Sequence, residues 1–256
     1  MKIVADENIP LLRNFFDDMG VIETYPGRQL TNECVKDADV LLVRSVTQVN
    51  ELLLSGSNVK FVGTCTIGTD HIDTEYLQQS GISFSSAPGC NANSVVEYVI
   101  STLSVLSESR HIDLSALTVG VVGCGNVGSR VVSMLKRLGV DVLCCDPLID
   151  QTGMVSFEEV LSCDIISLHT PLTTEGPYPT HHLFNAETLA KLSEQQILIN
   201  TGRGAVVDGD ALKQKLIQEP EFTAVLDVWE TEPNIDRELA ELADIEGFGE
   251  EMGQEL

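Results

Sequence analysis

Three glycines have the spacing of a loop that could bind a pyrophosphate, Gly123-x-Gly125-x-x-Gly128. In such a loop the first glycine permits a tight turn, the second lets the backbone approach the phosphates, and the third lets a helix pack closely against a strand. Asn126 and Val127 complete the loop at the start of that helix, where free backbone N–H groups attract an anion. The same pattern also occurs in ordinary turns, so the flanking residues decide the interpretation.

The flanking residues favour a dinucleotide-binding loop. The apolar run at residues 117–122 predicts a strand directly before it, and residues 129–138 predict a helix directly after it. Asp146 follows Gly128 by 18 residues, at the end of the next apolar run. A carboxylate at that point accepts hydrogen bonds from the adenosine ribose and repels a 2′-phosphate, which selects NAD over NADP. The alternative is that Asp146, which precedes a proline, only caps a turn.

Two arginines are candidates for binding an acidic substrate. Arg203 lies between two glycines directly after an apolar run, where its guanidinium could bind a carboxylate through two parallel hydrogen bonds. The net charge of −24 repels anions, so an acid-binding site needs its basic groups gathered locally. Arg44 could screen a phosphate or could face solvent. The alternative for Arg203 is a surface arginine on a glycine turn.

The elements that position these residues alternate between strands and helices, which predicts parallel sheets. In the first part of the chain we expect strands at 2–5, 40–43, 60–62 and 82–84, with helices at 8–19 and 31–37. A long helix follows at 93–109, with Asn93 or Ser94 as its N-cap. Strands return at 117–122, 141–145, 164–168, 196–199 and 223–228. The prediction is an α/β fold of two Rossmann-like, doubly wound parallel-sheet domains: a flavodoxin-like substrate domain at residues 1–93 and an NAD-binding Rossmann domain at 94–245.

Composition excludes several classes of partner. Fifteen scattered basic residues against 39 acidic ones oppose binding to nucleic acid or to an anionic membrane surface. No apolar run approaches the roughly 18 residues that a membrane span needs. Seven cysteines, an odd number without a C-x-x-C pair, favour a reduced cytoplasm over a disulfide framework. The histidines lack the spacing of zinc ligands, so no metal is expected.

Several further motifs resemble those of the D-2-hydroxyacid dehydrogenases. In chain order they are RSVT at 44–47, FVGTCTIGTDHID at 61–73, APGCNA at 87–92, NTGRG at 200–204 and VLDVWETEP at 225–233. The opening ADENIP at 5–10, HTPL at 169–172 and EGPYPTHHL at 175–183 resemble the branch of that family that oxidises 4-phospho-D-erythronate. The resemblance runs from residue 1 to about residue 245.

The resemblance implies a reaction and roles for individual residues. A phosphorylated 2-hydroxy acid would be oxidised at C2 by NAD, on the route to pyridoxal phosphate, by an enzyme that forms a homodimer at full length. Arg203 would bind the substrate carboxylate, and Glu232 would orient the histidine that takes the hydroxyl proton, although a glutamate before proline is often only a solvated loop residue. Ser45 and Thr66 would bind substrate, unless their hydroxyls only cap turns. The remaining implied cofactor contacts are Thr170, Thr201, Gly202 and Asp227.

The sequence departs from the family after Ile245. The family continues there to a His-Ile-Ala-Gly-like motif that holds the catalytic histidine, whereas Gly249 stands near that position in this chain. The five histidines present, at 71, 111, 169, 181 and 182, do not replace it. We therefore expect a C-terminally truncated or frame-shifted form, with a disordered tail at 246–256, no dimerisation segment and impaired turnover.

Two other functions stay open at this point. A non-catalytic NAD-binding module would keep the fold and lose the chemistry, which the presence of both Arg203 and Glu232 argues against. A dehydrogenase for another D-2-hydroxy acid would share every motif above, and the effect of a 4-phosphate on kcat/KM would distinguish it.

Overall fold

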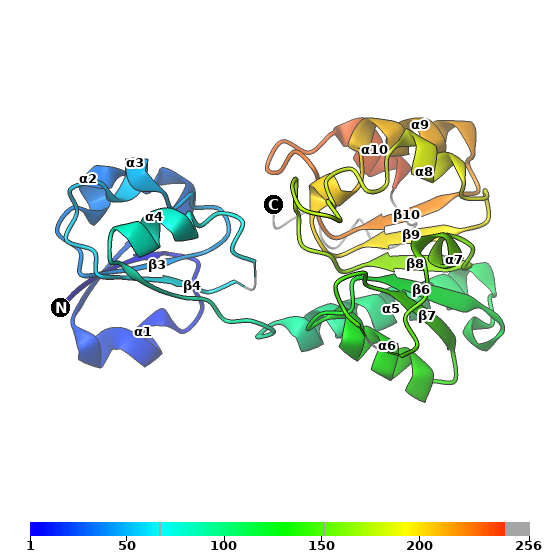
Figure 1. Cartoon of the computed structure of the whole chain (residues 1–256), viewed down its shortest axis with the longest axis horizontal. Helices are drawn as coiled ribbons and strands as arrows, with labels where there is room; N and C mark the ends of the chain where they lie inside the picture. Colours follow the sequence, from blue (N-terminus) through cyan, green and yellow to red (C-terminus); the bar gives the residue numbers. More distant parts are fainter. Residues whose placement is uncertain (67, 151, 244–256) are drawn as a thin grey trace. The chain divides into compact units, whose positions relative to one another are not determined.

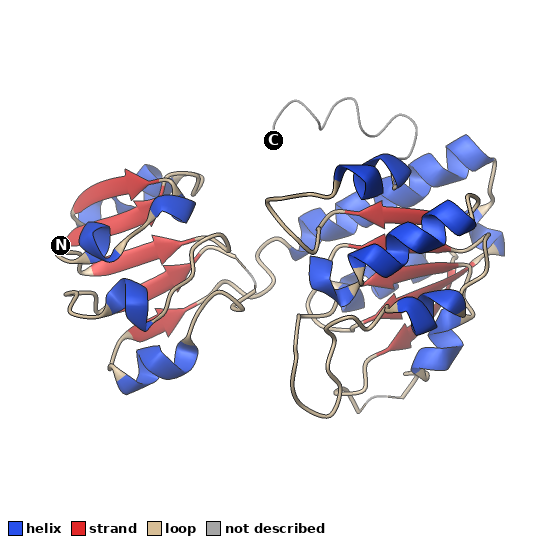
Figure 2. Ribbon diagram, turned by 90° about the horizontal axis from the view of Figure 1, so that it is seen from above, coloured by secondary structure: helices blue, strands red, loops and turns tan. Residues whose placement is uncertain are grey.

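The structure is a computed structural model that describes residues 1–66, 68–150 and 152–243. The chain divides into two compact units, Met1–Asn91 and a second unit from Ala92 onward. The expected disordered tail at 246–256 lies outside the described residues. Each unit is an α/β layer structure with helices on both faces of its sheet (Figure 2).

The first unit is built on a five-stranded parallel sheet. Its strands are β1 (Lys2–Asp6), β2 (Val21–Tyr25), β3 (Val40–Val43), β4 (Phe61–Thr64) and β5 (Ser83–Ser85). The order β2-β1-β3-β4-β5 is that of a flavodoxin-like sheet, which confirms the predicted fold. β2 was not expected from the sequence, because Ile22 is its one buried residue and the apolar pattern is therefore weak.

Helices cover both faces of this sheet (Figure 1). They are α1 (Leu12–Phe16), α2 (Asn32–Val35), α3 (Glu51–Leu54) and α4 (Thr74–Gln79), with 3-10 helices η1 (Asp17–Met19) and η2 (Gly27–Gln29). α2, α3 and α4 cover one face, over Val4 and Leu41, whereas α1 covers the other, over Ile3 and Leu42. Successive residues of β1 and β3 thus enter opposite apolar layers, as expected for strands inside a parallel sheet.

The second unit has a parallel sheet in the order β10-β9-β8-β6-β7. Its strands are β6 (Thr118–Val122), β7 (Asp141–Cys145), β8 (Ile165–Leu168), β9 (Ile197–Asn200) and β10 (Thr223–Leu226). A parallel bridge between Cys144 and Met154 adds a vestigial strand beyond β7. With this bridge counted as the third strand, the order becomes 3-2-1-4-5-6, that of a dinucleotide-binding Rossmann sheet. The predicted Rossmann fold is confirmed.

The helices of the second unit form two layers. They are α5 (Ala92–Arg110), α6 (Gly128–Arg137), α7 (Phe157–Leu161), α8 (Ala186–Ala190), α9 (Gly209–Gln218) and α10 (Arg237–Leu242), with 3-10 helices η3 (Leu114–Ala116) and η4 (Gly204–Val206). α5 and α6 share one apolar layer with Val119 and Val121 of β6, while α7 to α10 share the other layer with Ile166 and Leu168 of β8.

Two sequence expectations about these helices were wrong. Neither Asn93 nor Ser94 is the N-cap of α5, because the helix already begins at Ala92. The Asn93 side chain instead accepts a hydrogen bond from Arg130 of α6. Leu138, the last residue of the helix expected at 129–138, lies past the end of α6 and is exposed.

The structure also bears on the expectations about disulfide bonds and membrane-spanning helices. All seven cysteines are free thiols in the structure, as the sequence suggested. Over the described ranges, no helix combines the length and the apolar character needed to cross a bilayer.

Candidate active site

The topological switch point of the second unit lies between β6 and β8. From β6 the chain continues to β7 on one side, and from β8 it continues to β9 on the other. Ligands of doubly wound sheets bind at the carboxyl ends of the strands at this point. The glycine loop follows β6 there, and His169 and Thr170 follow β8. The fold therefore brings the predicted pyrophosphate loop beside the predicted nicotinamide contact Thr170.

Glycine is found at the three loop positions for different structural reasons. Gly123 has φ +88°, and a Cβ on it would lie 2.9 Å from the backbone carbonyl of His169. A Cβ on Gly128 would lie 1.9 Å from the carbonyl oxygen of Gly123, so the start of α6 packs directly on the turn. A Cβ on Gly125 would have no described atom within 4 Å. Packing within the protein thus explains why positions 123 and 128 need glycine, whereas Gly125 leaves open space for a ligand.

Asp146, the predicted ribose contact, holds the glycine loop. Its Oδ2 accepts a hydrogen bond from the backbone N–H of Cys124 (2.8 Å), and its Oδ1 accepts one from the N–H of Leu148 (3.1 Å). The carboxylate is half-buried at the end of β7. Because one oxygen binds the glycine loop, the acidic residue and the pyrophosphate loop are fixed relative to each other.

The residues around the switch point fit a dinucleotide. The Oγ1 of Thr170 is buried and has no hydrogen-bond partner among the described residues, so a ligand group could satisfy it. Gly202 approaches the same segment, and a Cβ on it would lie 2.9 Å from the Thr170 carbonyl oxygen. Asn126 and Val127 stand at the exposed or half-exposed start of α6. Together with the open space at Gly125, these features fit NAD.

His169 contacts a predicted cofactor residue, Thr201, and stays neutral. Its Nε2 lies 2.9 Å from the Ser167 hydroxyl, and its Nδ1 lies 3.0 Å from the hydroxyl of Thr201, a predicted cofactor contact. Desolvation by burial lowers the pKa of His169 to about 4. The imidazole is therefore uncharged at neutral pH and serves to orient Thr201.

The buried His169 predicts a loss of stability in acid. Between pH 6.5 and about 4 the unfolded chain protonates this histidine while the folded chain does not, so the free energy of unfolding falls as pH falls. The contribution reaches about 3 kcal/mol at the acid end of this window. Urea titrations from pH 7.5 to 4 should show a flatter pH profile for His169→Gln than for the exposed-site control His111→Gln. Parallel profiles for the two variants would contradict the assignment.

Arg203 and Glu232 lie on two loops that touch each other. A Cβ on Gly204 would lie 2.0 Å from the backbone carbon of Trp229, which shows how closely the loop after β9 approaches the loop after β10. Arg203 donates from Nη1 to the Gly202 carbonyl (2.9 Å), and Glu232 accepts from the Trp229 N–H through Oε1 (2.7 Å). The structure thus brings both predicted catalytic residues to the carboxyl edge of β9 and β10.

Asp227, the next predicted cofactor contact, belongs to the same loop. Desolvation, and then repulsion from the Glu232 carboxylate, raise the pKa of Asp227 above its usual range. Its backbone N–H donates to the carbonyl of Asn200 at the end of β9 (3.0 Å). The loop therefore begins at a fixed point and holds the carboxylates of Asp227 and Glu232 near each other.

His182 and Glu230, called here the histidine clamp, connect the loop after β10 to the segment that precedes α8. The Nε2 of His182 lies 2.5 Å from Oε1 of Glu230, whose Oε2 accepts from the N–H of Gly209 (2.8 Å). With His181, whose ring stacks on His182, the clamp places three potential metal-ligand atoms within 4.8 Å of one another. Both oxygens of Glu230 already accept or share protein hydrogen bonds, so the clamp needs no ion to be satisfied.

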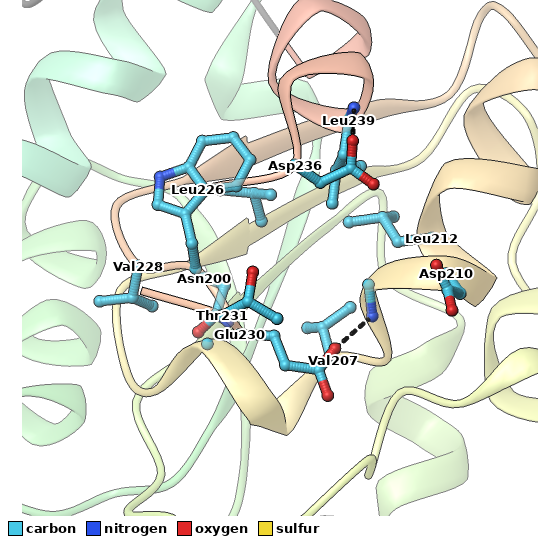
Figure 3. Close-up of a pocket in the computed structure, with 13 residues that line it drawn as sticks. Asn200, Val207, Asp210, Leu212, Leu226, Val228, Glu230, Thr231, Asp236 and Leu239 are labelled. Carbon is cyan, nitrogen blue, oxygen red and sulfur yellow. Dashed lines mark hydrogen bonds between the residues drawn. The ribbon is translucent and has the colours of Figure 1, made fainter. Parts of the chain in front are cut away.

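A pocket of about 220 Å³ lies beside the clamp (Figure 3). Its lining includes the apolar side chains of Leu212, Leu226 and Leu239 and the carboxylates of Glu230 and Asp236. Typical ligand sites are about 300–1,000 Å³, and two carboxylates repel an anionic substrate. We therefore assign neither NAD nor the substrate to this pocket.

The first unit has its own switch point, between β1 and β3. Asp6 ends β1 there: it is fully buried, its Oδ1 accepts from the Asn8 N–H (2.8 Å), and its Oδ2 has no partner in the described part of the chain. Arg44, half-buried, and Ser45, exposed, follow β3. The predicted substrate residue Ser45 and the candidate Arg44 are thus at the edge of the sheet where a ligand is expected.

Thr66 follows the neighbouring strand β4 and is part of a hydrogen-bond chain. Its hydroxyl lies 2.8 Å from that of Thr64, which in turn lies 2.9 Å from Nε2 of His71. Thr64 and His71 were not singled out from the sequence, and neither were Ser167, His169 and the His182–Glu230 clamp. Thr64, Ser167 and His169 share one signal, a hydroxyl or imidazole at or next to the carboxyl end of a buried strand, which alone does not distinguish a functional role from packing.

Comparison with known proteins identifies the class. Residues 101–245 match the family described as D-isomer specific 2-hydroxyacid dehydrogenase, NAD binding domain. The chain therefore belongs to the D-isomer specific 2-hydroxyacid dehydrogenases, and its cofactor is NAD.

Within this family, the chain is similar to curated relatives that share one name. The chain is 56% identical over 245 residues to the erythronate-4-phosphate dehydrogenase of Hahella chejuensis, covering 94% of this chain and 64% of the relative. It is 54% identical over 246 residues to the enzyme of the same name from Marinobacter nauticus, covering 93% and 64%. The chain thus spans about 64% of the length of these relatives.

Solved structures show the same fold. A D-lactate dehydrogenase from Aquifex aeolicus, complexed with NAD and lactic acid, has a TM-score of 0.80 at 29% identity, covering 96% of this chain and 86% of that one. An NAD⁺-bound 3-phosphoglycerate dehydrogenase from Entamoeba histolytica has a TM-score of 0.76 at 29% identity, covering 91% and 82%.

Proposed function

We propose that the protein is an NAD-dependent dehydrogenase that oxidises 4-phospho-D-erythronate at C2 to 2-oxo-3-hydroxy-4-phosphobutanoate for pyridoxal phosphate synthesis. Turnover by this chain is impaired, because Gly249 stands near the position of the family's proton-accepting histidine. The observation that carries the substrate is the 52–56% identity to relatives named erythronate-4-phosphate dehydrogenase. The NAD-binding family match and the arrangement at the β6–β8 switch point support the cofactor.

Each of the predicted site residues has a separate role in this reaction. NAD, when bound at the glycine loop, supplies the hydride acceptor. Arg203 binds the substrate carboxylate and polarises the C2 oxygen, because a guanidinium stays charged and binds two oxygens at once. Ser45 and Thr66 hold further substrate oxygens. Glu232 would orient the histidine that accepts the hydroxyl proton in the family, a residue that none of the five histidines of this sequence replaces. The Trp229 N–H keeps the Glu232 carboxylate in place.

Replacement of Arg203 tests the substrate assignment. Arg203→Gln should weaken 4-phospho-D-erythronate binding about 10- to 100-fold, because hydrogen bonds to charged groups contribute about 1.5–3 kcal/mol. Isothermal titration calorimetry in the presence of NADH measures the substrate Kd, and NADH fluorescence measures the cofactor Kd. Arg237→Gln, at the exposed start of α10, is the matched control and should change neither. An unchanged substrate Kd in Arg203→Gln would remove this arginine from the substrate site.

The substrate itself is tested by comparison with other acids. Wild-type protein should bind 4-phospho-D-erythronate more tightly than D-erythronate, D-glycerate or D-lactate, because the phosphate adds charge-assisted hydrogen bonds. Equal affinity with and without the phosphate would favour a dehydrogenase for another D-2-hydroxy acid. Binding of NADH without binding of any of these acids would favour a non-catalytic NAD-binding module.

Two properties of the whole protein complete the proposal. The seven free thiols fit the reducing cytoplasm, and fractionation of cells expressing a tagged protein would test that location. The family resemblance supports a homodimer, which light scattering coupled to size-exclusion chromatography would test at the length of the relatives.

A further inference from the structure

A buried histidine in the first unit is connected to the predicted substrate residue Thr66. His71 and Thr64 are 5% and 4% exposed, and Nε2 of His71 lies 2.9 Å from Oγ1 of Thr64. The Thr64 oxygen lies 2.8 Å from Oγ1 of Thr66, which is half-buried and lies 3.3 Å from the carbonyl oxygen of Gly68. A continuous hydrogen-bond chain thus runs from the buried imidazole to the carboxyl edge of the sheet.

The backbone holds both ends of this chain in place. Thr64 is the last residue of β4, and its strand is paired with β3 and β5. The carbonyl of His71 accepts from the N–H of Val49 (2.8 Å), which is the start of a parallel bridge between Val49 and Ile72. The backbone positions of Thr64 and His71 are therefore fixed relative to the sheet.

The number of protons restricts the direction of the hydrogen bonds. Each threonine hydroxyl has one proton, so it donates once and accepts the other bonds. If Thr66 donates to the Gly68 carbonyl, Thr64 must donate to Thr66, and Thr64 must accept from a protonated Nε2 of His71. If instead the imidazole accepts at Nε2, Thr64 donates inward to it and Thr66 donates inward to Thr64. The Thr66–Gly68 contact then has no proton.

The first direction is the one that suits an acidic substrate. The carbonyl of Gly68 can only accept, and the structure places the Thr66 hydroxyl within reach of it. The 3.3 Å separation is longer than the usual 2.7–2.8 Å of a hydroxyl hydrogen bond, so the Thr66 proton is held weakly and can turn to a better acceptor. A carboxylate or phosphate oxygen is such an acceptor, because charge-assisted bonds are about twice as strong.

We propose that His71 is a positioning residue which, through Thr64, makes Thr66 a hydrogen-bond donor to an anionic oxygen of the substrate. The proposal rests on the proposed function, which assigns Thr66 to the substrate. His71 touches neither substrate nor cofactor in this scheme. It donates from Nε2 to Thr64, Thr64 donates to Thr66, and the Thr66 proton moves from the Gly68 carbonyl to the bound anion. The three bonds polarise one another in the same direction, which strengthens the last of them.

Paired substitutions separate this role from packing. Thr64→Val removes the hydroxyl at constant shape, and Thr64→Ser keeps it; His71→Leu removes the donor, and His71→Gln can place an amide N–H near the position of Nε2. We expect Thr64→Val and His71→Leu to weaken 4-phospho-D-erythronate binding about tenfold, while Thr64→Ser and His71→Gln restore most of the affinity. Calorimetry with the full chain and NADH measures the substrate Kd. The NADH Kd and the melting temperature, measured in parallel, identify any variant that has merely unfolded.

A spectroscopic measurement tests the direction of the hydrogen bonds in wild-type protein. ¹⁵N NMR of labelled histidine distinguishes a protonated from an unprotonated Nε2, and His71→Gln assigns the signal. We expect a protonated Nε2 in the free protein and in the complex with 4-phospho-D-erythronate. An unprotonated Nε2 would overturn the proposal, whether or not the substrate binds.

The outcomes distinguish this proposal from the proposed function. If wild-type protein binds 4-phospho-D-erythronate and Thr64→Val and Thr64→Ser bind it equally, the positioning role is overturned while the function stands. If wild-type protein binds a different 2-hydroxy acid, the proposed substrate is wrong, and the same variant pairs measured with that acid decide the role of His71. If it binds no acid at all, both fail.

Discussion

Gly125→Val is expected to weaken NADH binding about 1,000-fold while leaving the melting temperature unchanged. The Cβ of the new side chain would meet no described protein atom within 4 Å, so we expect the fold to accommodate it. It occupies the space through which the pyrophosphate approaches the backbone, which removes about two charge-assisted hydrogen bonds of roughly 2 kcal/mol each. NADH fluorescence titration and a thermal melt measure the two effects separately.

The neighbouring Gly128 provides the contrasting control. In Gly128→Ala the new Cβ would lie 1.9 Å from the Gly123 carbonyl oxygen, which is backbone and cannot turn aside. This variant should lose stability as well as NADH affinity, because α6 must move away from the loop. A loss of stability in Gly125→Val, or NADH binding unaffected by it, would show that the open space at Gly125 does not receive the cofactor.

Asp146→Ala is expected to change the preference for NADH over NADPH by roughly 1,000-fold. The substitution removes hydrogen bonds from the adenosine ribose hydroxyls to a carboxylate, which contribute about 1.5–3 kcal/mol. It also removes the repulsion of a 2′-phosphate, which is about 1–4 kcal/mol for charges 4 Å apart near a protein surface. Fluorescence titrations with the two cofactors give the ratio of their Kd values.

Asp146→Asn separates the charge from the loop support. Asn can still accept the hydrogen bond that the Cys124 N–H donates to Asp146, so the glycine loop keeps its support, but the negative charge is gone. NADPH affinity should therefore rise in Asp146→Asn with little change in melting temperature. If NADPH remained excluded from both variants, the discrimination would have to come from another residue.

Local patterns in the sequence were sufficient to predict where the glycine loop and Asp146 lie in the fold. The strand, glycine spacing and acidic residue at Asp146 form one βαβ unit, so their relation is determined over a short stretch of chain. The bond from Cys124 to Asp146 could not be predicted, because a backbone N–H has no signature in the sequence. The same holds for the close approach of Gly204 to Trp229, which joins loops from two different strands.

Supporting residues and weakly patterned elements were beyond prediction. β2 has one buried residue, Ile22, so its sequence lacks the apolar signal of a central strand. Thr64 and His71 lie within a motif that was recognised, but their connection to Thr66 depends on side-chain directions that spacing does not give. Asn93 was expected to cap α5 because its type is common at that position, yet the helix starts earlier and Asn93 contacts Arg130 instead.

The neutral imidazole of His169 has a consequence for the balance between the two redox forms of the cofactor. The oxidised nicotinamide ring is a cation and the reduced ring is not, so a fixed positive charge nearby would favour the reduced form and, with it, oxidation of the hydroxy acid. His169 supports Thr201 through its two nitrogens and is uncharged above about pH 4. His169 itself therefore adds no electrostatic bias toward either form, and its contribution to the ratio of NAD⁺ to NADH affinity should stay constant from pH 6 to pH 8.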